Sequence, residues 1–123
     1  MNSKKLLIVE DDLLSKESLI KILEGYGYTN IHWVSSGMDA FNYIKENKTD
    51  LILMDITLEG KLDGIDTAKI VDNNIPVIFT SSSKDSNTFK RVATTKSFGF
   101  LQKPYTPALV KEALDNAFSQ TAE

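Results

Sequence analysis

Residues 51–60 read LILMDITLEG, in which four apolar residues run into one carboxylate, Asp55, before the chain reaches a glycine. An apolar run of this length without polar alternation is typical of a strand that is buried on both faces of a parallel sheet. Parallel sheets in α/β proteins bind ligands beyond the carboxyl ends of their strands. The stretch therefore predicts that a buried strand carries Asp55 to the binding edge of such a sheet.

Four other apolar runs predict strands of the same kind, buried on both faces. They are LLIVE (6–10), IHWV (31–34), VIFT (77–80) and FGFL (98–101).

Helical patterns separate these runs. Apolar residues at i, i+3, i+4 and i+7 predict one helix that ends at Gly25–Gly27 and another near the C-terminus. The residues in these patterns are Leu19, Ile22, Leu23 and Tyr26, and then Val110, Ala113, Leu114 and Ala117. Capping signals at Ser36, with Asp39, and at Thr106, with Pro107, predict helix starts, the first for a helix over 37–47. Shorter, more polar patterns predict helices over 64–72 and 85–95.

Alternation of five strands with five helices requires crossover connections, which give a parallel sheet with helices on both faces. We therefore expect a three-layer α/β/α fold. At 123 residues the chain has the size of one domain, and we expect residues 1–123 to form it without a further output domain.

Composition excludes several classes of site. The chain has no cysteine, so thiolate metal sites and disulfides are excluded, and its one histidine, His32, excludes a histidine-built metal centre. A formal net charge of −3 gives no general attraction to nucleic acid, and we expect no direct nucleic-acid binding. The N-terminal apolar run meets acids too early for a signal peptide or membrane span, so we expect a cytoplasmic protein.

Four of the five predicted strands end in, or lead into, residues with charged or hydroxyl side chains. Strand one ends in Glu10, Asp11 and Asp12, strand three in Asp55, and strand four in Thr80, while Lys103 and Pro104 follow strand five. Three carboxylates about 5 Å apart would repel by roughly 3 kcal/mol per pair at an effective dielectric constant near 20. Mg²⁺ is the natural counter-charge, because it binds one or two carboxylates and leaves room for phosphate oxygens.

These residues resemble the receiver domain of two-component response regulators. The motifs LLIVEDD, LILMD with DG at 63–64, PVIFTS and FGFLQKPY occur in the family's order and at similar separations over nearly the whole chain. The resemblance implies a flavodoxin-like sheet in the order 2-1-3-4-5. It also implies a signalling domain, not an enzyme, that catalyses only its own phosphorylation and dephosphorylation. Its partner would be a sensor histidine kinase or a histidine phosphotransfer protein, and its downstream target would be another protein.

The resemblance also implies roles for individual residues. Asp55 would be the phosphoacceptor, assisted by Thr80 and Lys103. Mg²⁺, or Mn²⁺ as a substitute, would be held by Glu10, Asp11, Asp55 and the backbone carbonyl of Thr57. Thr80 and Phe100 would form the switch that remodels the surface of the fourth helix, fifth strand and fifth helix, and the Lys103–Pro104 peptide would be cis. The resemblance leaves open whether phosphorylation produces a homodimer.

The sequence departs from the family pattern beside the predicted site. The loop ITLEGKLDG after Asp55 lacks the common Met-Pro and is one residue longer than usual, and Ser81 replaces a small alanine or glycine. Thr57 and Ser82 occupy positions that tune dephosphorylation in the family.

Several of these residues also have other interpretations. Asp12 is a good helix N-cap, and Phe100 suits a hydrophobic core. A haloacid-dehalogenase-like phosphatase would need a second Asp where Thr57 stands, and an FMN-binding flavodoxin would not place Glu10 and Asp11 at its phosphate loop. A receiver-shaped interaction module that works without phosphorylation is the remaining alternative.

Overall fold

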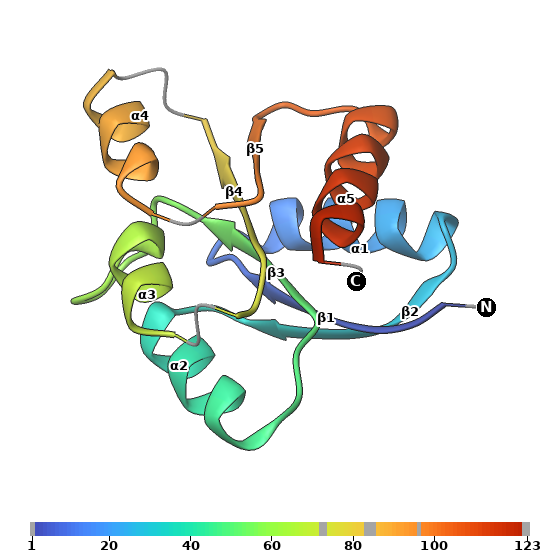
Figure 1. Ribbon diagram of the computed structural model, residues 1–123, viewed down its shortest axis with the longest axis horizontal. Coiled ribbons are helices and arrows are strands. Elements are labelled where there is room, and N and C mark those ends of the chain that lie inside the picture. The colour runs from blue at the N-terminus through green and yellow to red at the C-terminus, as the bar shows by residue number, and fades with distance from the viewer. Residues whose placement is uncertain (1, 72–73, 83–85, 96, 122–123) are drawn as a thin grey trace.

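Five parallel strands form one sheet with helices on both faces in the computed structural model, which describes residues 2–71, 74–82, 86–95 and 97–121 (Figure 1). The elements are β1 (Asn2–Val9), α1 (Leu13–Gly25), β2 (Tyr28–Val34), α2 (Gly37–Glu46), β3 (Leu51–Asp55), α3 (Gly64–Ile70), β4 (Val77–Ser81), α4 (Ser86–Ala93), β5 (Gly99–Gln102) and α5 (Pro107–Thr121). The spatial order is β2-β1-β3-β4-β5, which confirms the flavodoxin-like α/β fold predicted from the sequence.

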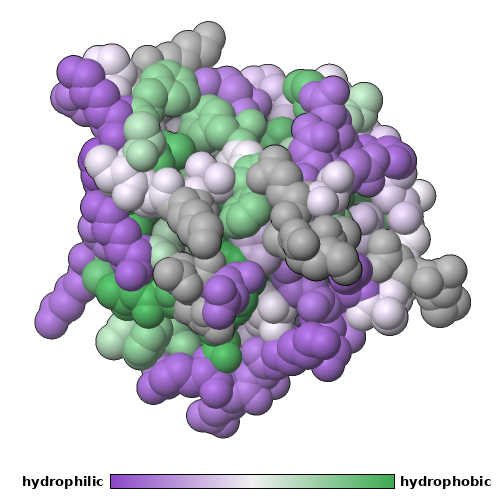
Figure 2. All heavy atoms as spheres, viewed as in Figure 1, coloured by the Kyte–Doolittle hydropathy of each residue, from purple (hydrophilic) through white to green (hydrophobic). Residues whose placement is uncertain are grey.

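Side chains alternate between the two faces of the sheet, and each face has its own apolar cluster. Leu6 and Ile8 of β1 lie in the cluster under α1 and α5, whereas Leu7 and Val9 lie in the cluster under α2 and α3. Figure 1 shows α1 and α5 on one side of the sheet and α2, α3 and α4 on the other. The face drawn in Figure 2 carries hydrophilic and hydrophobic side chains next to one another. The core residues of the two apolar clusters are buried.

The outer strands correct one prediction. IHWV and FGFL were expected to be buried on both faces, but β2 and β5 are the edges of the sheet. Thr29, Asn30, His32 and Trp33 of β2 are exposed, and Leu101 is the one buried residue of β5. An edge strand has a neighbour on one side only, so its apolar run is incompletely covered.

The caps begin the helices as predicted. Ser36 accepts a hydrogen bond from the Asp39 N–H at 3.1 Å, and Thr106 accepts one from the Leu109 N–H at 3.2 Å. The predicted helices over 64–72 and 85–95 are observed as the shorter α3 and α4, with residues 72 and 85 outside the described part of the chain.

The end of α1 differs from the prediction, because Tyr26 was assigned to the apolar face of that helix. It is the C-cap instead, and its N–H bonds to the carbonyl of Leu23. No helix among the described residues is long and apolar enough to cross a membrane.

Candidate functional site

The carboxyl ends of the central strands bring the predicted site residues together. Glu10 directly follows β1, Asp55 is the last residue of β3, and Thr80 lies beside Asp55 in the register of β3 and β4. Lys103 follows β5. Because the strands are parallel, these ends share one edge of the sheet, as the sequence predicted.

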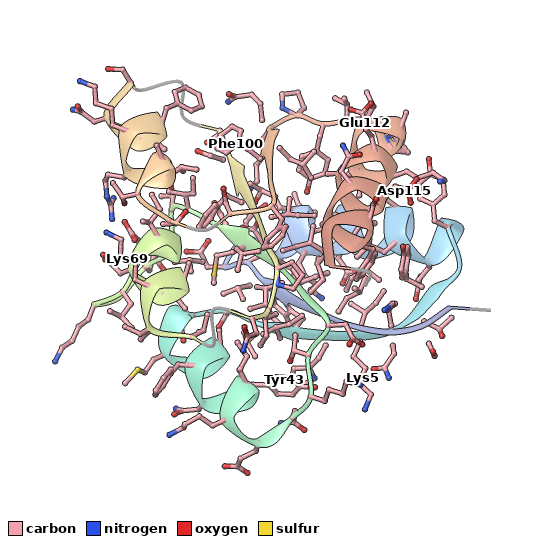
Figure 3. All side chains as sticks on the ribbon, viewed as in Figure 1. Lys5, Tyr43, Lys69, Phe100, Glu112 and Asp115 are labelled. Carbon is pink, nitrogen blue, oxygen red and sulfur yellow. The ribbon has the colours of Figure 1, made fainter. Side chains whose placement is uncertain are left out.

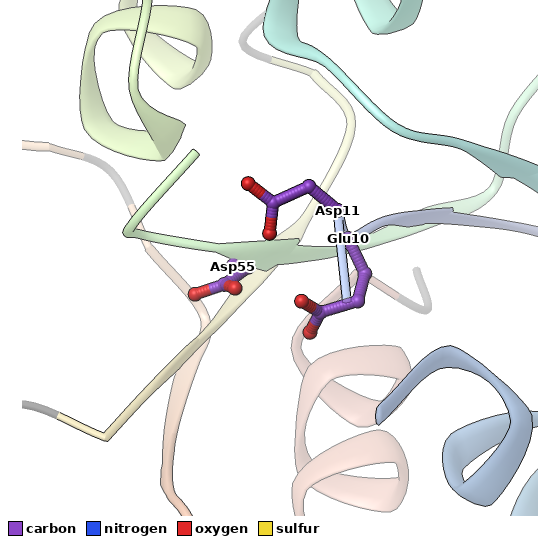
Figure 4. Close-up of side chains that lie close together, drawn as sticks. All are labelled: Glu10, Asp11 and Asp55. Atoms are coloured by element: carbon purple, nitrogen blue, oxygen red, sulfur yellow. The ribbon is translucent and has the colours of Figure 1, made fainter. Parts of the chain in front are cut away.

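Three carboxylates converge at this edge, from Glu10, Asp11 and Asp55 (Figure 4). One oxygen from each lies within 4.8 Å of the others. Glu10 and Asp55 are buried, with 4% and 6% of their surface exposed, and Asp11 is more exposed. A cluster of carboxylate oxygens open to solvent on one side fits a hard divalent cation such as Mg²⁺, which binds one or two carboxylates and keeps several waters. The residues present therefore suit the ion that the family resemblance implies.

Lys103 supplies the positive charge within the site. Its Nζ donates to Glu10 Oε1 at 2.8 Å and to Asp55 Oδ2 at 3.3 Å, and its side chain is 20% exposed. Burial disfavours the charged ammonium, but the ion pairs with Glu10 and Asp55 outweigh burial and raise the pKa of Lys103 above its ordinary value. Lys103 is therefore a cation held between two of the three acids.

The electrostatics single out Asp55. Burial, and then the neighbouring Glu10, raise the pKa of the Asp55 carboxyl from 3.8 to about 7. Lys103 and a hydrogen bond from the Thr57 N–H to Asp55 Oδ1, 3.1 Å long, act in the opposite direction without cancelling the effect. Strongly shifted acids of this kind cluster at functional sites. Burial and Glu10 therefore favour the protonated form of the Asp55 carboxyl, and a bound cation would oppose them.

The longer loop after Asp55 closes against the acidic cluster. Leu58 is buried in the apolar cluster under α2 and α3, which anchors the loop. The next residue, Glu59, donates its backbone N–H to Asp11 Oδ2 at 3.2 Å. A proline in place of Glu59 would lack this donor, so the absence of Met-Pro gives Asp11 a partner that proline could not supply.

The DG pair at 63–64 has a steric explanation. A Cβ on Gly64 would lie 2.2 Å from the carbonyl oxygen of Asp55, too close for any side chain. Asp63 caps α3 by accepting from the Asp66 N–H at 2.9 Å. Helix α3 thus starts against the backbone of the predicted phosphoacceptor because residue 64 is a glycine.

The other predicted residues are placed as follows. Thr80 is buried, with 3% of its surface exposed, and Ser81 is fully buried. Thr57 and Ser82 are exposed. Phe100 packs against the cluster under α2 and α3 and meets the Phe89 ring edge-on, with centroids 5.2 Å apart. The Lys103–Pro104 peptide is cis, the isomer that the resemblance implies.

The structure also separates structural residues from site residues. Asp12 caps α1 by accepting from the Ser15 N–H at 2.9 Å, which confirms the helix-cap interpretation of this acid. The contacts to the acids that the sequence did not predict include the Glu59 N–H on Asp11 and the Trp33 indole N–H, which donates to the Glu10 carbonyl at 2.7 Å. The backbone contact has no signal in the sequence. For Trp33 the available signal was a single tryptophan near the end of the predicted strand 31–34. The predicted order 2-1-3-4-5 places that strand next to the one that ends in Glu10.

Comparison with known proteins agrees with this geometry. Residues 6–115 match the family model described as the response regulator receiver domain. The chain is 37% identical over 110 residues to the uncharacterized transcriptional regulatory protein YbdJ of Bacillus subtilis (strain 168), covering 87% of this chain and 47% of that protein. It is 26% identical over 106 residues to the DNA-binding response regulator MtrA of Mycobacterium tuberculosis (strain H37Rv), covering 85% and 46%. The chain thus spans about half the length of these relatives.

Solved structures give the same result. The signal receiver domain of a modulated diguanylate cyclase from Desulfovibrio desulfuricans G20 is similar with a TM-score of 0.88 and 32% identity, covering 98% of this chain and 97% of that one. The N-terminal domain of a response regulator/sensory box/GGDEF protein from Carboxydothermus hydrogenoformans is similar with a TM-score of 0.84 and 29% identity, covering 95% of both chains. Given the family match over most of its length, the chain belongs to the response regulator receiver domain family.

Proposed function

We propose that this chain is the phosphoacceptor of a two-component or phosphorelay system and that Asp55 receives the phosphoryl group from a phosphohistidine of a kinase or phosphotransfer protein. The observation that carries the proposal is the convergence of three carboxylates within 4.8 Å, with Lys103 bridging two of them. A purely structural role would not require three mutually repelling carboxylates at the carboxyl end of the sheet.

The transfer replaces one bond to phosphorus by another. An oxygen of the ionised Asp55 attacks phosphorus, the P–O bond forms as the P–N bond to the histidine breaks, and the departing imidazole nitrogen keeps the electron pair of that bond. Such a reaction depends on positioning and on neutralising the charge of the phosphoryl oxygens. The end of β3 holds Asp55 rigidly, and the Thr57 N–H orients its Oδ1.

Lys103 and Thr80 would contact the transferred group. The Lys103 ammonium already lies 3.3 Å from Asp55 Oδ2, where it can neutralise a phosphoryl oxygen. Thr80 adds a hydroxyl from the neighbouring strand. Glu10, Asp11, Asp55 and the Thr57 carbonyl would hold the Mg²⁺, or Mn²⁺ in its place. When bound, this ion would favour the ionised form of Asp55 and offset charge on the phosphoryl oxygens.

The output would be a shift between two states of the surface formed by α4, β5 and α5. In this proposal Thr80 moves toward the phosphoryl oxygens and Phe100 repacks into the space it leaves. The contact between Phe100 and Phe89 supports it, because repacking of Phe100 would be transmitted directly to α4. The Thr80→Ala variant should still be phosphorylated while its α4 and β5 NMR shifts change little. Shift changes equal to those of the wild type would contradict this switch.

Partners follow from the same proposal. The phosphodonor would be a histidine kinase or histidine phosphotransfer protein, and the target a protein that binds the switched surface. The relatives named for transcription or DNA binding are about twice as long as this chain. With a formal net charge of −3, residues 1–123 would not themselves bind DNA.

Intact-mass analysis after incubation with acetyl phosphate tests the phosphoacceptor role. The wild type with Mg²⁺ should gain one base-labile phosphoryl group, and EDTA or Asp55→Asn should abolish the gain. Asp12→Asn is the matched control, because Asn also caps helices well and this acid lies outside the cluster. A phosphoryl group gained by Asp55→Asn at the wild-type rate would refute the assignment.

A further inference from the structure

Trp33, the one tryptophan of the chain, contacts the backbone of the acidic site from an edge strand. Its indole Nε1 donates to the Glu10 carbonyl at 2.7 Å, although 36% of the residue is exposed. That carbonyl belongs to the peptide that joins Glu10 to Asp11, two of the three clustered acids. The indole thus fixes the peptide plane from which both carboxylates project.

The remaining polar groups of Glu10 are fixed as well. Its N–H donates to the Val34 carbonyl at 3.1 Å, while its carboxylate accepts from the Asp12 N–H at 3.1 Å and from Lys103 at 2.8 Å. The Trp33 bond is the contact that holds the carbonyl side. A carbonyl held in this way cannot rotate freely with the β1–α1 connection, because the peptide is planar.

Lys16 lies over the indole ring of Trp33. Its Nζ lies 4.5 Å from the centroid of the Trp33 ring, and its side chain is only 13% exposed. Lys16 belongs to α1, which starts directly after the acids. Trp33 therefore connects β2, the end of β1 and the first turns of α1 around the acidic cluster.

We infer that Trp33 is a positioning residue, whose indole N–H orders the Glu10–Asp11 peptide and so sets the affinity of the acidic cluster for a divalent cation. The inference deepens the proposed function and rests on it. Trp33 touches neither the cation nor the phosphoryl group in this role and acts through Glu10.

Replacement of Trp33 by benzothienylalanine tests the inference, since this analogue keeps the bicyclic ring and the Lys16 contact but lacks the N–H donor. Loss of one such hydrogen bond should weaken Mg²⁺ binding by about 2- to 10-fold in titration calorimetry. In metal-free protein, amide exchange of Glu10 and Asp12 should become faster. His32→Ala, on the same strand but stacked on Tyr43, should not weaken Mg²⁺ binding.

The outcomes separate this inference from the proposed function. Wild-type affinity in the analogue, even with a lower free energy of unfolding, would show a merely structural tryptophan and overturn the inference alone. If the wild type binds no Mg²⁺ at millimolar concentrations, the metal-dependent function falls. In that case the amide exchange of Glu10 and Asp12 still tests whether Trp33 orders the Glu10–Asp11 peptide. Exchange rates unchanged in the analogue would overturn that part of the inference too.

Discussion

Helices α5 and α4 flank the last strand but are attached to the sheet in opposite ways. α5 buries Val110, Leu114 and Ala117 in an apolar cluster, and its charged Glu112 and Asp115 point to solvent (Figure 3). None of the described residues of α4 is buried. The contacts of α4 include the Phe89–Phe100 ring pair and a forked ion pair from Arg91 to Asp63 at 2.8 and 3.2 Å.

This difference bears on which part of the domain can change state. Moving α5 would expose a continuous apolar surface. Moving α4 would instead disturb the Phe89–Phe100 ring contact, the packing of the partly buried Val92 and the solvent-accessible ion pairs of Arg91. Segments with few buried apolar contacts open at low free energy. The difference in burial therefore predicts that α4, next to the strand that carries Phe100, opens at lower free energy than α5.

The largest effect on the free energy of unfolding is expected in α5. Leu114→Ala should lower the free energy of unfolding by about 2–5 kcal/mol, because it leaves a cavity in a fully buried position. The matched change in α4 is Phe89→Ala. Because Phe89 is 42% exposed, this change should lower the free energy of unfolding clearly less. Urea denaturation of both variants makes the comparison. Equal losses would show that α4 is as firmly attached as α5.

A second effect is expected where α3 meets the phosphoacceptor. Gly64→Ala should destabilise the fold by about 1–3 kcal/mol, since the new methyl group overlaps the Asp55 carbonyl and the backbone must shift. It should also reduce phosphorylation of Asp55. Gly25→Ala is the control, because a Cβ there meets nothing within 4 Å. If Gly64→Ala is as stable as Gly25→Ala, α3 does not depend on this close approach.

The sequence predicted the fold and the site where local patterns determine them. Buried strands are continuous apolar runs, so β3 and β4 were recognisable, and the acids at strand ends follow from parallel topology. What could not be predicted depends on contacts between distant segments. The edge position of β2 left His32 and Trp33 exposed, and the Arg91 ion pair to the α3 cap joins residues 28 positions apart. No local periodicity records such pairs.

The stability of the acidic site should depend on pH through the ionisation of Asp55. Burial and Glu10 raise its pKa from 3.8 to about 7, so between pH 4 and 7 the unfolded chain loses a proton that the folded chain keeps. This group therefore makes the fold less stable as pH rises through that window, and its contribution levels off above pH 7. Asp55→Asn removes the contribution.

Urea denaturation in EDTA at several pH values measures this effect. The advantage of Asp55→Asn over the wild type should grow from pH 4 to 7 and then stay constant, whereas Asp12→Asn, the control at an exposed helix cap, should show no such growth. A constant difference between Asp55→Asn and the wild type across the window would mean that Asp55 ionises normally in the folded protein.

The smallest effect should come from the ion pair that connects α4 to α3. Arg91 is 44% exposed at its side chain, so Arg91→Ala should cost only about 0.2–1 kcal/mol of unfolding free energy, and less at high salt. Locally the change should be larger: amide exchange in α4 should speed up while exchange in α5 is unchanged, because Arg91 holds α4 against the α3 cap. Lys90→Ala, also exposed and on the same helix, is the control. Faster exchange in both helices would mean that α4 and α5 open together, and the contrast between a firmly packed α5 and a loosely packed α4 would be wrong.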